Sequence, residues 1–468
     1  MGRHSTRAAL AVALAAAALY AATRPADASN VAAGLGEGRT LTVPTWLSVL
    51  TGAAAVGASG LLAALVTDRA FVDALHGRSR PVATWLPRGP VRRFAGGLGV
   101  AGLAAVVLVG LDGPRTPTAN LAVLLAFVGL RSVLPMVAFL VANPWPAVDP
   151  FRTLAGALSR AAGADGVVAY PERLRSWPAV VGLAALLLLE LLAPVTTDPR
   201  ALATATLGYA AVTVACAFAF SPRIWFRRGD PLAVLFRLYG AVAPLRRDGD
   251  GLRLSLPGSR LREGGVVADA SEVAFVVLVV WELTFNGFVV TPPGARTIEG
   301  LVAAGVPPRA GYLLVFLAGF ALFLGLYRLA AVLSRRTAPT FLAAPALARL
   351  FAPPLLAVAA GYHLAHYVAF AVSLAPATLA ALANPLSPPV NPTVLAAPGW
   401  VGGLETAFVL AGHLLAVWVA HAVALDRFPG RLQAIRSQYP FVAVMVCYTA
   451  ASLWLLSLPT AAPPYVGG

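Results

Sequence analysis

Ten apolar runs, each close to the length of a membrane-crossing helix, constrain the fold of this chain more than any other feature. A bilayer core requires about 20 apolar residues per helix. Hydrophobic residues make up 59% of the 468 positions and charged residues only 12%, which is more apolar surface than a soluble protein buries. We therefore predict an all-α polytopic transmembrane helix bundle, with spans near 46–66, 94–111, 120–142, 177–194, 201–220, 266–290, 310–333, 350–373, 401–424 and 438–458.

The N-terminus is typical of a secretory signal peptide. Arg3 and Arg7 form a basic region, an apolar run covers 8–23, and small residues occupy 26–29 as at a cleavage site. We predict a signal peptide over 1–28, and an uncleaved signal anchor is the alternative. The expected domain organisation is then an external segment at 29–45, the helix bundle at 46–458 and an external tail at 459–468.

The arginines predict how the bundle is oriented. The loops at 67–93, 143–176, 221–265, 334–349 and 425–437 contain 25 arginines, whereas the opposite loops and tails from residue 24 onward contain six. Cytoplasmic loops of membrane proteins carry this excess, so both ends of the mature chain are expected outside a plasma membrane that the protein crosses many times. The same distribution accounts for the net charge of +15. The lipid bilayer is thus the expected partner, and no nucleic-acid partner is expected.

The longest arginine-rich loop carries two local patterns. An apolar patch bounded by arginines at 231–243 predicts an amphipathic helix, which either lies on the inner leaflet or packs against the bundle. The stretch at 252–261 alternates apolar and polar residues, which predicts a short hairpin strand.

Three charged residues within the predicted spans are candidates for function. Ionisable groups inside a membrane are costly and usually face the bundle interior. Arg131 requires a carboxylate or carbonyl partner, and Glu282 or Glu190 is the natural one. Both glutamates are therefore interpreted either as charge compensation or as catalytic groups, with one of them a metal ligand or the general base beside a metal-bound water.

Three histidines are the candidate metal ligands. His363 and His366 are three residues apart, so they share one face of a helix. His413 on the next span is expected at a similar distance from the outer boundary. Imidazoles from adjacent helices suit a transition metal such as zinc, copper or iron, although each histidine has a packing role as its alternative. His421 is expected near the inner membrane interface.

Several stretches together resemble the fenitrothion-hydrolase-type integral membrane proteins of bacteria and archaea. The resemblance covers nearly the whole mature chain and implies a polytopic membrane protein linked by name to hydrolysis of an organophosphate ester. Two departures are Asn286, where the family pattern has Asp, and Ala422, where it has an acidic residue. The matching stretches are VPTWL (43–47), NPWPAVDPFR (143–152), YPERLRSWPAVVGLAALLLLELLAP (170–194), RRGDPLAVLFRLYGAVAPL (227–245), TFNGFVVTP (284–292), and the C-terminal AGHLLAVWVAH and RSQYPFVAVMVCYTAASLWLLS.

Three functions remain open from the sequence. The first is a metal-dependent hydrolase of a lipophilic, organophosphate-like ester, because a bound metal activates water and polarises a phosphoryl oxygen. The second is a redox subunit that holds b-type haem or copper through histidines on neighbouring helices. The third is a transporter, or an assembly subunit with a second membrane subunit as partner, in which Arg131, Glu190 and Glu282 form a polar pathway between helices.

Overall fold

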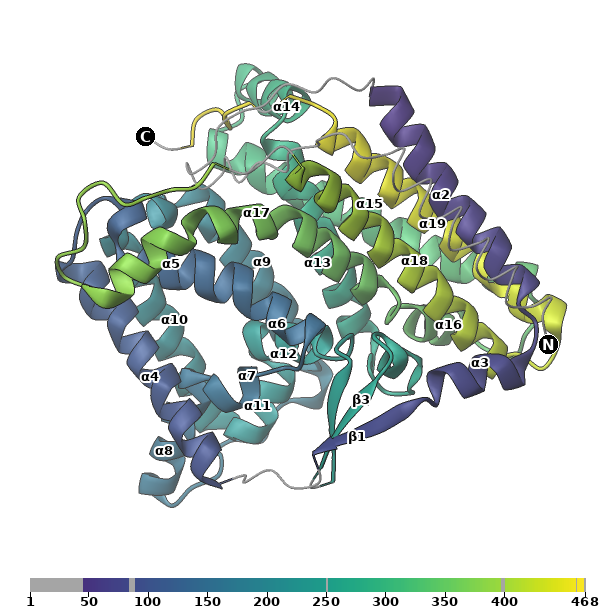
Figure 1. The fold of residues 1–468 in the computed structure, drawn as a ribbon, viewed down its shortest axis with the longest axis horizontal. Helices are drawn as coiled ribbons and strands as arrows, with labels where there is room; N and C mark the ends of the chain where they lie inside the picture. The colour runs from purple at the N-terminus through teal and green to yellow at the C-terminus, as the bar shows by residue number, and fades with distance from the viewer. Residues whose placement is uncertain (1–44, 84–88, 250, 397–399, 460, 467–468) are drawn as a thin grey trace.

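The computed structural model describes residues 45–83, 89–249, 251–396, 400–459 and 461–466, and it is an all-α polytopic bundle (Figure 1). The predicted signal peptide and most of the external N-terminal segment lie outside the described residues. Within the described ranges, eight helical segments are long and apolar enough to cross a membrane: α4 (Gly89–Asp112), Leu121–Leu140, α10 (Pro199–Phe220), α13 (Ala270–Val289), α15 (Pro308–Thr337), Ala344–Ala383, α18 (Val401–Arg427) and α19 (Arg431–Leu456).

The two remaining predicted spans are also helices, and both are unusual. α2 (Thr45–Leu65) and α3 (Arg69–His76) form a pair bent by 114° at a short break. Asp68 sits in this break and accepts a hydrogen bond from Phe71 N, so it caps α3 and starts a new helix direction. α9 (Trp177–Leu192) has only 16 residues. At 1.5 Å per residue it is about 24 Å long, which is shorter than a typical hydrocarbon core.

A three-stranded antiparallel sheet ties two arginine-rich loops together. β1 (Ser79–Ala83) belongs to the loop at 67–93, whereas β2 (Leu245–Asp248) and β3 (Gly251–Ser255) belong to the loop at 221–265. The strand order is β1-β3-β2, and Arg246 lies opposite Arg253 in the β2–β3 hairpin. The expected strand within 252–261 is therefore present. Because the two loops share one sheet, they lie on the same side of the bundle.

Hydrogen bonds place further arginine-rich loops on the same side of the bundle. Arg69 donates to Pro429 O at 2.7 Å, and Thr337 donates to Arg436 O at 3.0 Å. At the opposite end, Ala461 N donates to Val290 O at 2.8 Å. Figure 1 shows the sheet at the lower edge, with α14 (Pro292–Ala303) and the C-terminus at the upper edge. The arginine distribution thus sorts the loops into two faces, as the orientation rule requires.

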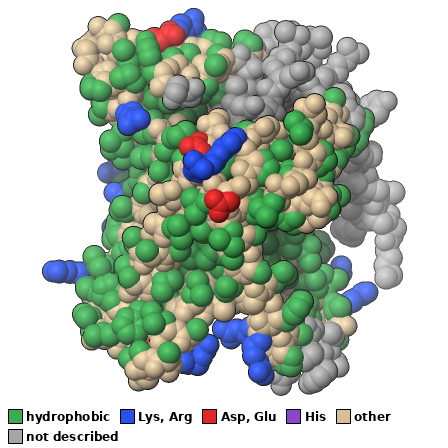
Figure 2. All heavy atoms as spheres, turned by 90° about the vertical axis from the view of Figure 1, so that its left-hand side faces the viewer, with side chains coloured by type: hydrophobic (Ala, Val, Ile, Leu, Met, Phe, Trp, Pro, Cys, Tyr) green, Lys and Arg blue, Asp and Glu red, His purple; other side chains and the backbone are tan. Residues whose placement is uncertain are grey.

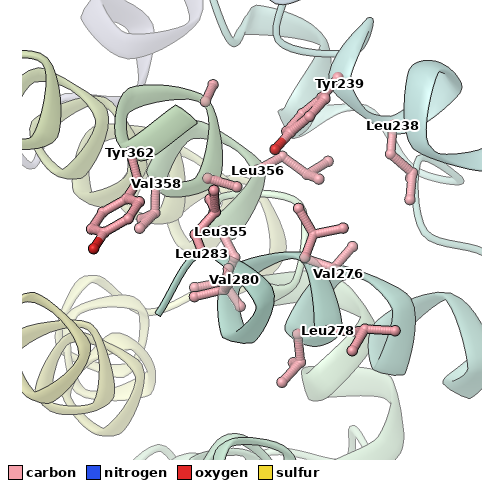
Figure 3. Close-up of a cluster of buried hydrophobic side chains, with 14 of the residues drawn as sticks. Leu238, Tyr239, Val276, Leu278, Val280, Leu283, Leu355, Leu356, Val358 and Tyr362 are labelled. Atoms are coloured by element: carbon pink, nitrogen blue, oxygen red, sulfur yellow. The ribbon is translucent and has the colours of Figure 1, made fainter. Parts of the chain in front are cut away.

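The core lies where α13 and α17 (Leu355–Ala383) meet α12 (Pro231–Tyr239). Figure 3 shows side chains of these three helices converging, among them Val276, Leu356 and Tyr239. A helix that is apolar on all sides belongs in the middle of a bundle, and nearly every residue of α13 is buried. By contrast, α4, α10 and α15 expose large apolar side chains, and Figure 2 shows hydrophobic side chains over much of the described surface on one side. These outer helices form the surface that suits lipid.

The predicted amphipathic helix within 231–243 forms as α12, and it packs against the bundle. Asp230 caps it and Pro231 begins it, a combination that favours a helix start. Phe236, Leu238 and Tyr239 are buried. The helix therefore adopts the packed alternative. Four further short helices complete the same side: α7 (Trp145–Val148), α8 (Pro150–Ala162), α11 (Pro222–Arg228) and α16 (Ala344–Phe351).

The helices that carry the candidate histidines are in direct contact. A Cβ atom placed on Gly361 of α17 would lie 2.5 Å from Phe408 O and 2.8 Å from the Cα atom of Gly412 in α18. Only glycine at both positions permits so close a backbone approach. The predicted adjacency of the two helices is therefore present.

Candidate functional site

A π-helical segment within the Leu121–Leu140 span positions Arg131. This segment, η3 (Leu125–Val133), lies between α5 (Leu121–Leu124) and α6 (Leu134–Leu140), and Leu134 N donates to Gly129 O. Pro135 has no N–H with which to bond the carbonyl of Arg131. This missing donor is one reason for the departure from α-helical geometry. Such segments occur often at functional sites.

Arg131 joins two acidic residues from different helices. Its Nε lies 3.2 Å from Glu190 Oε2 of α9, and its Nη2 is paired with Glu282 Oε1 of α13. Asn286, one turn along α13, donates to Glu282 Oε1 at 2.9 Å. The guanidinium also lies 5.2 Å from the centre of the Tyr367 ring. We call Arg131, Glu190, Glu282, Asn286 and Tyr367 the Arg131 cluster.

The two glutamates differ in exposure. The side chain of Glu282 is 6% exposed and that of Glu190 is 28% exposed. Glu282 is therefore enclosed by the bundle, whereas Glu190 lies at its margin. Both serve as charge partners of Arg131, which is one of the two roles considered for them. A catalytic role for either stays a prediction.

His363 and His366 border the Arg131 cluster through Tyr367. The ring of His363 lies 4.5 Å from that of Tyr367, and the ring of His366 lies 4.8 Å from it. His363 Nε2 is 3.3 Å from Ser132 O, a carbonyl that only accepts, so this nitrogen carries the proton. Tyr239 of α12 packs edge-on against the same imidazole. The pair thus lies beside a buried ion pair.

His413 has a different environment from the other two histidines. Its Nδ1 donates to Val409 O at 2.8 Å within its own helix. Its Nε2 is buried without a hydrogen-bond partner in the described part of the chain. Across the described ranges, no group of three or more His, Cys, Asp and Glu side chains has an arrangement suited to a metal ion. The structure therefore brings His363 and His366 together beside Arg131, and the three-histidine metal site stays a prediction.

His421 was expected near the inner membrane interface, and it lies six residues before the C-terminal end of α18. It is fully buried, its Nε2 lies 2.8 Å from Val66 O, and its Nδ1 contacts the side-chain amide of Gln438. Val66 belongs to the break between α2 and α3. The histidine was expected at the interface because it is close to the charged end of α18, but packing of the bent pair against that end covers it.

A second buried polar group was missed by the sequence analysis. Asp230 Oδ2 accepts hydrogen bonds from Tyr209 at 2.6 Å and from Thr213 at 2.7 Å, and Thr213 accepts one from Trp225 Nε1. Asp149 lies nearby and caps α8 through a hydrogen bond from Arg152 N. We call this set, with Arg152, the Asp230 network. Both aspartates stand in Asp-Pro pairs, a helix-start signal that would have located them.

Burial controls the protonation of the two aspartates, which lie outside the spans. It raises the pKa of Asp149 to about 7, with the negative charge of Asp230 adding to the effect and the hydrogen bond from Arg152 N opposing it. Burial also raises the pKa of Asp230, opposed by the hydrogen bonds from Tyr209, Ala233 and Thr213. Desolvation disfavours the charged form of a carboxyl group.

Comparisons of the chain with protein-family models, with curated proteins and with solved structures find no match. The resemblance to the fenitrothion-hydrolase-type proteins therefore stays a prediction.

Proposed function

We propose that this multi-pass membrane protein is a transporter, and that the Arg131 cluster is its proton-binding centre. The observation that carries the proposal is that two carboxylates, Glu190 and Glu282, share a single guanidinium. One negative charge is left over inside an apolar bundle. An uncompensated charge in such surroundings is costly, and a proton is the smallest ligand that removes it.

The arrangement also supports proton transfer between sites. Glu190 lies at the margin of the bundle and Glu282 inside it, and the same guanidinium contacts both. Protonation of either carboxyl group frees Arg131 to pair fully with the other. The cluster therefore has two charge arrangements that differ in which glutamate holds the proton, which is the kind of alternation that a carrier requires.

The neighbouring residues favour a polar pathway. His363 and His366 place two imidazoles next to Tyr367, and a neutral imidazole has one nitrogen that donates a hydrogen bond and one that accepts. The π-helical segment that holds Arg131 is a local irregularity of the kind found where helices rearrange. Together these features extend the proposed path from Glu282 into the centre of the bundle.

Purified protein in liposomes tests the proposal. Liposomes containing a pH-sensitive dye receive a proton gradient, with valinomycin and potassium to discharge the membrane potential. We expect proton entry above that of protein-free liposomes, and loss of most of this entry in E282Q and E190Q. The matched control is E299Q, since Glu299 is an exposed residue of α14. Wild-type protein that carries no more protons than empty liposomes would overturn the proposal.

A metal-dependent hydrolase is the second candidate, favoured by one observation. Nε2 of His413, which has no hydrogen-bond partner among the described residues, is a lone-pair nitrogen, because the proton of this ring is on Nδ1. A metal held with His363 and His366 would activate water for attack on a lipophilic ester. Elemental analysis of wild type, H363A and H413A tests it, and a Soret band would point instead to b-type haem. In either case the expected location is the plasma membrane, with a second membrane subunit as a possible partner.

A further inference from the structure

A cavity at the arginine-rich face has the chemistry of an anion site. It lies between the loop at 261–268, α16 and the C-terminal end of α18, and its volume is about 260 Å³. This is slightly below the range of about 300–1,000 Å³ typical of pockets for drug-sized ligands. The cavity therefore suits a small group rather than a large substrate. None of its lining residues belongs to the Arg131 cluster.

Three arginines line the cavity. Arg262, Arg349 and Arg427 come from the loop, α16 and α18, respectively. Arg262 is paired with Asp73, and Arg262 and Arg427 both contact Asp426, at 3.3 Å and 3.6 Å. The ion pairs of the described residues include none for Arg349, whose Nη1 donates only to Ala268 O at 3.3 Å. At least one guanidinium thus has donors left for a ligand.

The acidic residue in the lining does not cancel this charge. Glu263 also lines the cavity, but its Oε1 is paired with Arg246 Nη1 at 2.7 Å. Arg246 belongs to β2 and is not part of the lining. The carboxylate of Glu263 is therefore already neutralised by a fourth arginine. Asp73 and Asp426 offset two of the three lining arginines, so the positive charge of one guanidinium remains.

The loop contributes backbone donors. Gly264 and Gly265 line the cavity, and Gly265 has a φ of +93°, which an L-residue with a side chain rarely adopts. In the described part of the chain, the N–H groups of residues 264–267 donate no hydrogen bond. Successive free N–H groups beside guanidinium groups form the type of concave site that binds oxyanions.

The rest of the lining is apolar. Leu261, Val266, Leu350, Pro353 and Val423 also border the cavity. The site is at the face that the arginine distribution assigns to the cytoplasmic leaflet, where anionic headgroups attract basic residues. A ligand with a phosphate group and an apolar part would meet both kinds of surface.

The geometry points to a phosphate-binding site formed by Arg262, Arg349, Arg427 and the free N–H groups of the glycine loop. Its ligand is a phosphate group, supplied either by the headgroup of an anionic phospholipid or by a small soluble phosphate. The three arginines and the backbone donors hold the phosphate oxygens, and the apolar wall accommodates the adjoining carbon atoms.

Native mass spectrometry of the detergent-purified full chain tests this site. Phosphatidylglycerol, phosphatidylcholine and inorganic phosphate are titrated separately onto wild type, R349Q/R427Q and the control R335Q/R336Q. Arg335 and Arg336 are exposed at the end of α15, so the control removes two charges elsewhere on the same face. We expect R349Q/R427Q to weaken binding about tenfold for each charge-assisted hydrogen bond that is lost, and the control to match wild type.

The separate titrations distinguish the two sources of phosphate. Tight binding of phosphatidylglycerol that inorganic phosphate does not displace identifies a lipid headgroup, whereas displacement identifies a soluble phosphate. Equal binding of phosphatidylcholine, equal loss in the control, or unchanged affinity in R349Q/R427Q would overturn the site. If the double variant does not fold, R349Q replaces it, since Arg349 makes a single hydrogen bond to a carbonyl.

Discussion

The Arg131 cluster and the Asp230 network each hold two carboxyl groups, but they stabilise them by different means. Within the membrane span, Glu190 and Glu282 pair with a guanidinium. Outside it, Asp230 relies on two hydroxyl groups and on the N-terminus of α12. Helix N-termini supply free N–H donors, but a continuous span has none in its middle. Position relative to the membrane thus determines which partner is available.

The comparison predicts the largest loss of folding stability when Arg131 is replaced. R131M leaves the buried Glu282 and the partly exposed Glu190 without a cation, and removal of one partner of a buried pair costs about 3–5 kcal/mol. We expect little folded protein, measured by gel filtration and thermal unfolding. The triple variant R131M/E190Q/E282Q has no charge left in the cluster and is expected to recover most of the loss. A change below about 1 kcal/mol in R131M would show that the pair is not buried as described.

A smaller loss of folding stability is expected for D230A. The substitution leaves the Tyr209 and Thr213 hydroxyl groups without their acceptor and removes the cap of α12, at a cost of about 2–4 kcal/mol. The control is D198A, because Asp198 caps α10 through one backbone hydrogen bond and is only partly buried. That variant should cost about 1 kcal/mol. Chemical unfolding compares the two, and equal losses would contradict a special role for the network.

The two regions should also differ in their response to pH. The folded-state pKa of Asp149, about 7, exceeds its ordinary value of 3.8, so the folded protein binds the proton more tightly. Stability is therefore highest below the ordinary value and falls as pH rises toward 7. Between about pH 5 and 8 this one group lowers the unfolding free energy by roughly 2–3 kcal/mol. D149N keeps the cap of α8. Over this pH range its unfolding free energy should therefore fall less than that of wild type, by roughly 2–3 kcal/mol. An identical fall in D149N would refute the assignment.

The smallest loss of folding stability is expected when an exposed arginine–glutamate pair is broken. Arg228 lies 2.6 Å from Glu172, whose side chain is 81% exposed. Solvent-exposed pairs contribute about 0–1 kcal/mol. E172Q should therefore leave the melting temperature almost unchanged, in contrast to E282Q. A loss as large as that of R131M would mean that burial does not explain the difference between the two sites.

Much of the fold could be predicted from the sequence, because membrane spans depend on length and apolarity. Each of the ten predicted runs corresponds to a helix, and the pairing of Arg131 with glutamates followed from the cost of a buried charge. What was missed depends on packing. The bend between α2 and α3 buries His421, and the sequence places that residue only by its distance from the end of α18.

The histidines illustrate the same limit. The depth of each residue follows from its position along a helix, but the direction of a side chain depends on how neighbouring helices are rotated. His363 contacts Ser132, Phe139 and Tyr239, whereas the hydrogen bond of His413 stays within its own helix. Contacts with Asn286 and Tyr367 were likewise missed, although both lie one turn from residues that were selected, Glu282 and His363.

Infrared difference spectroscopy after a pH jump tests the central claim, that the Arg131 cluster binds one proton between two carboxyl groups. We predict that wild-type protein shows the carbonyl band of a protonated carboxyl group in apolar surroundings. E282Q and E190Q should each shift or remove this band, and E299Q should retain it. Two results would contradict the account. One is a wild-type spectrum without such a band at any pH at which the protein is folded, and the other is a band that stays the same as in wild type in both E282Q and E190Q.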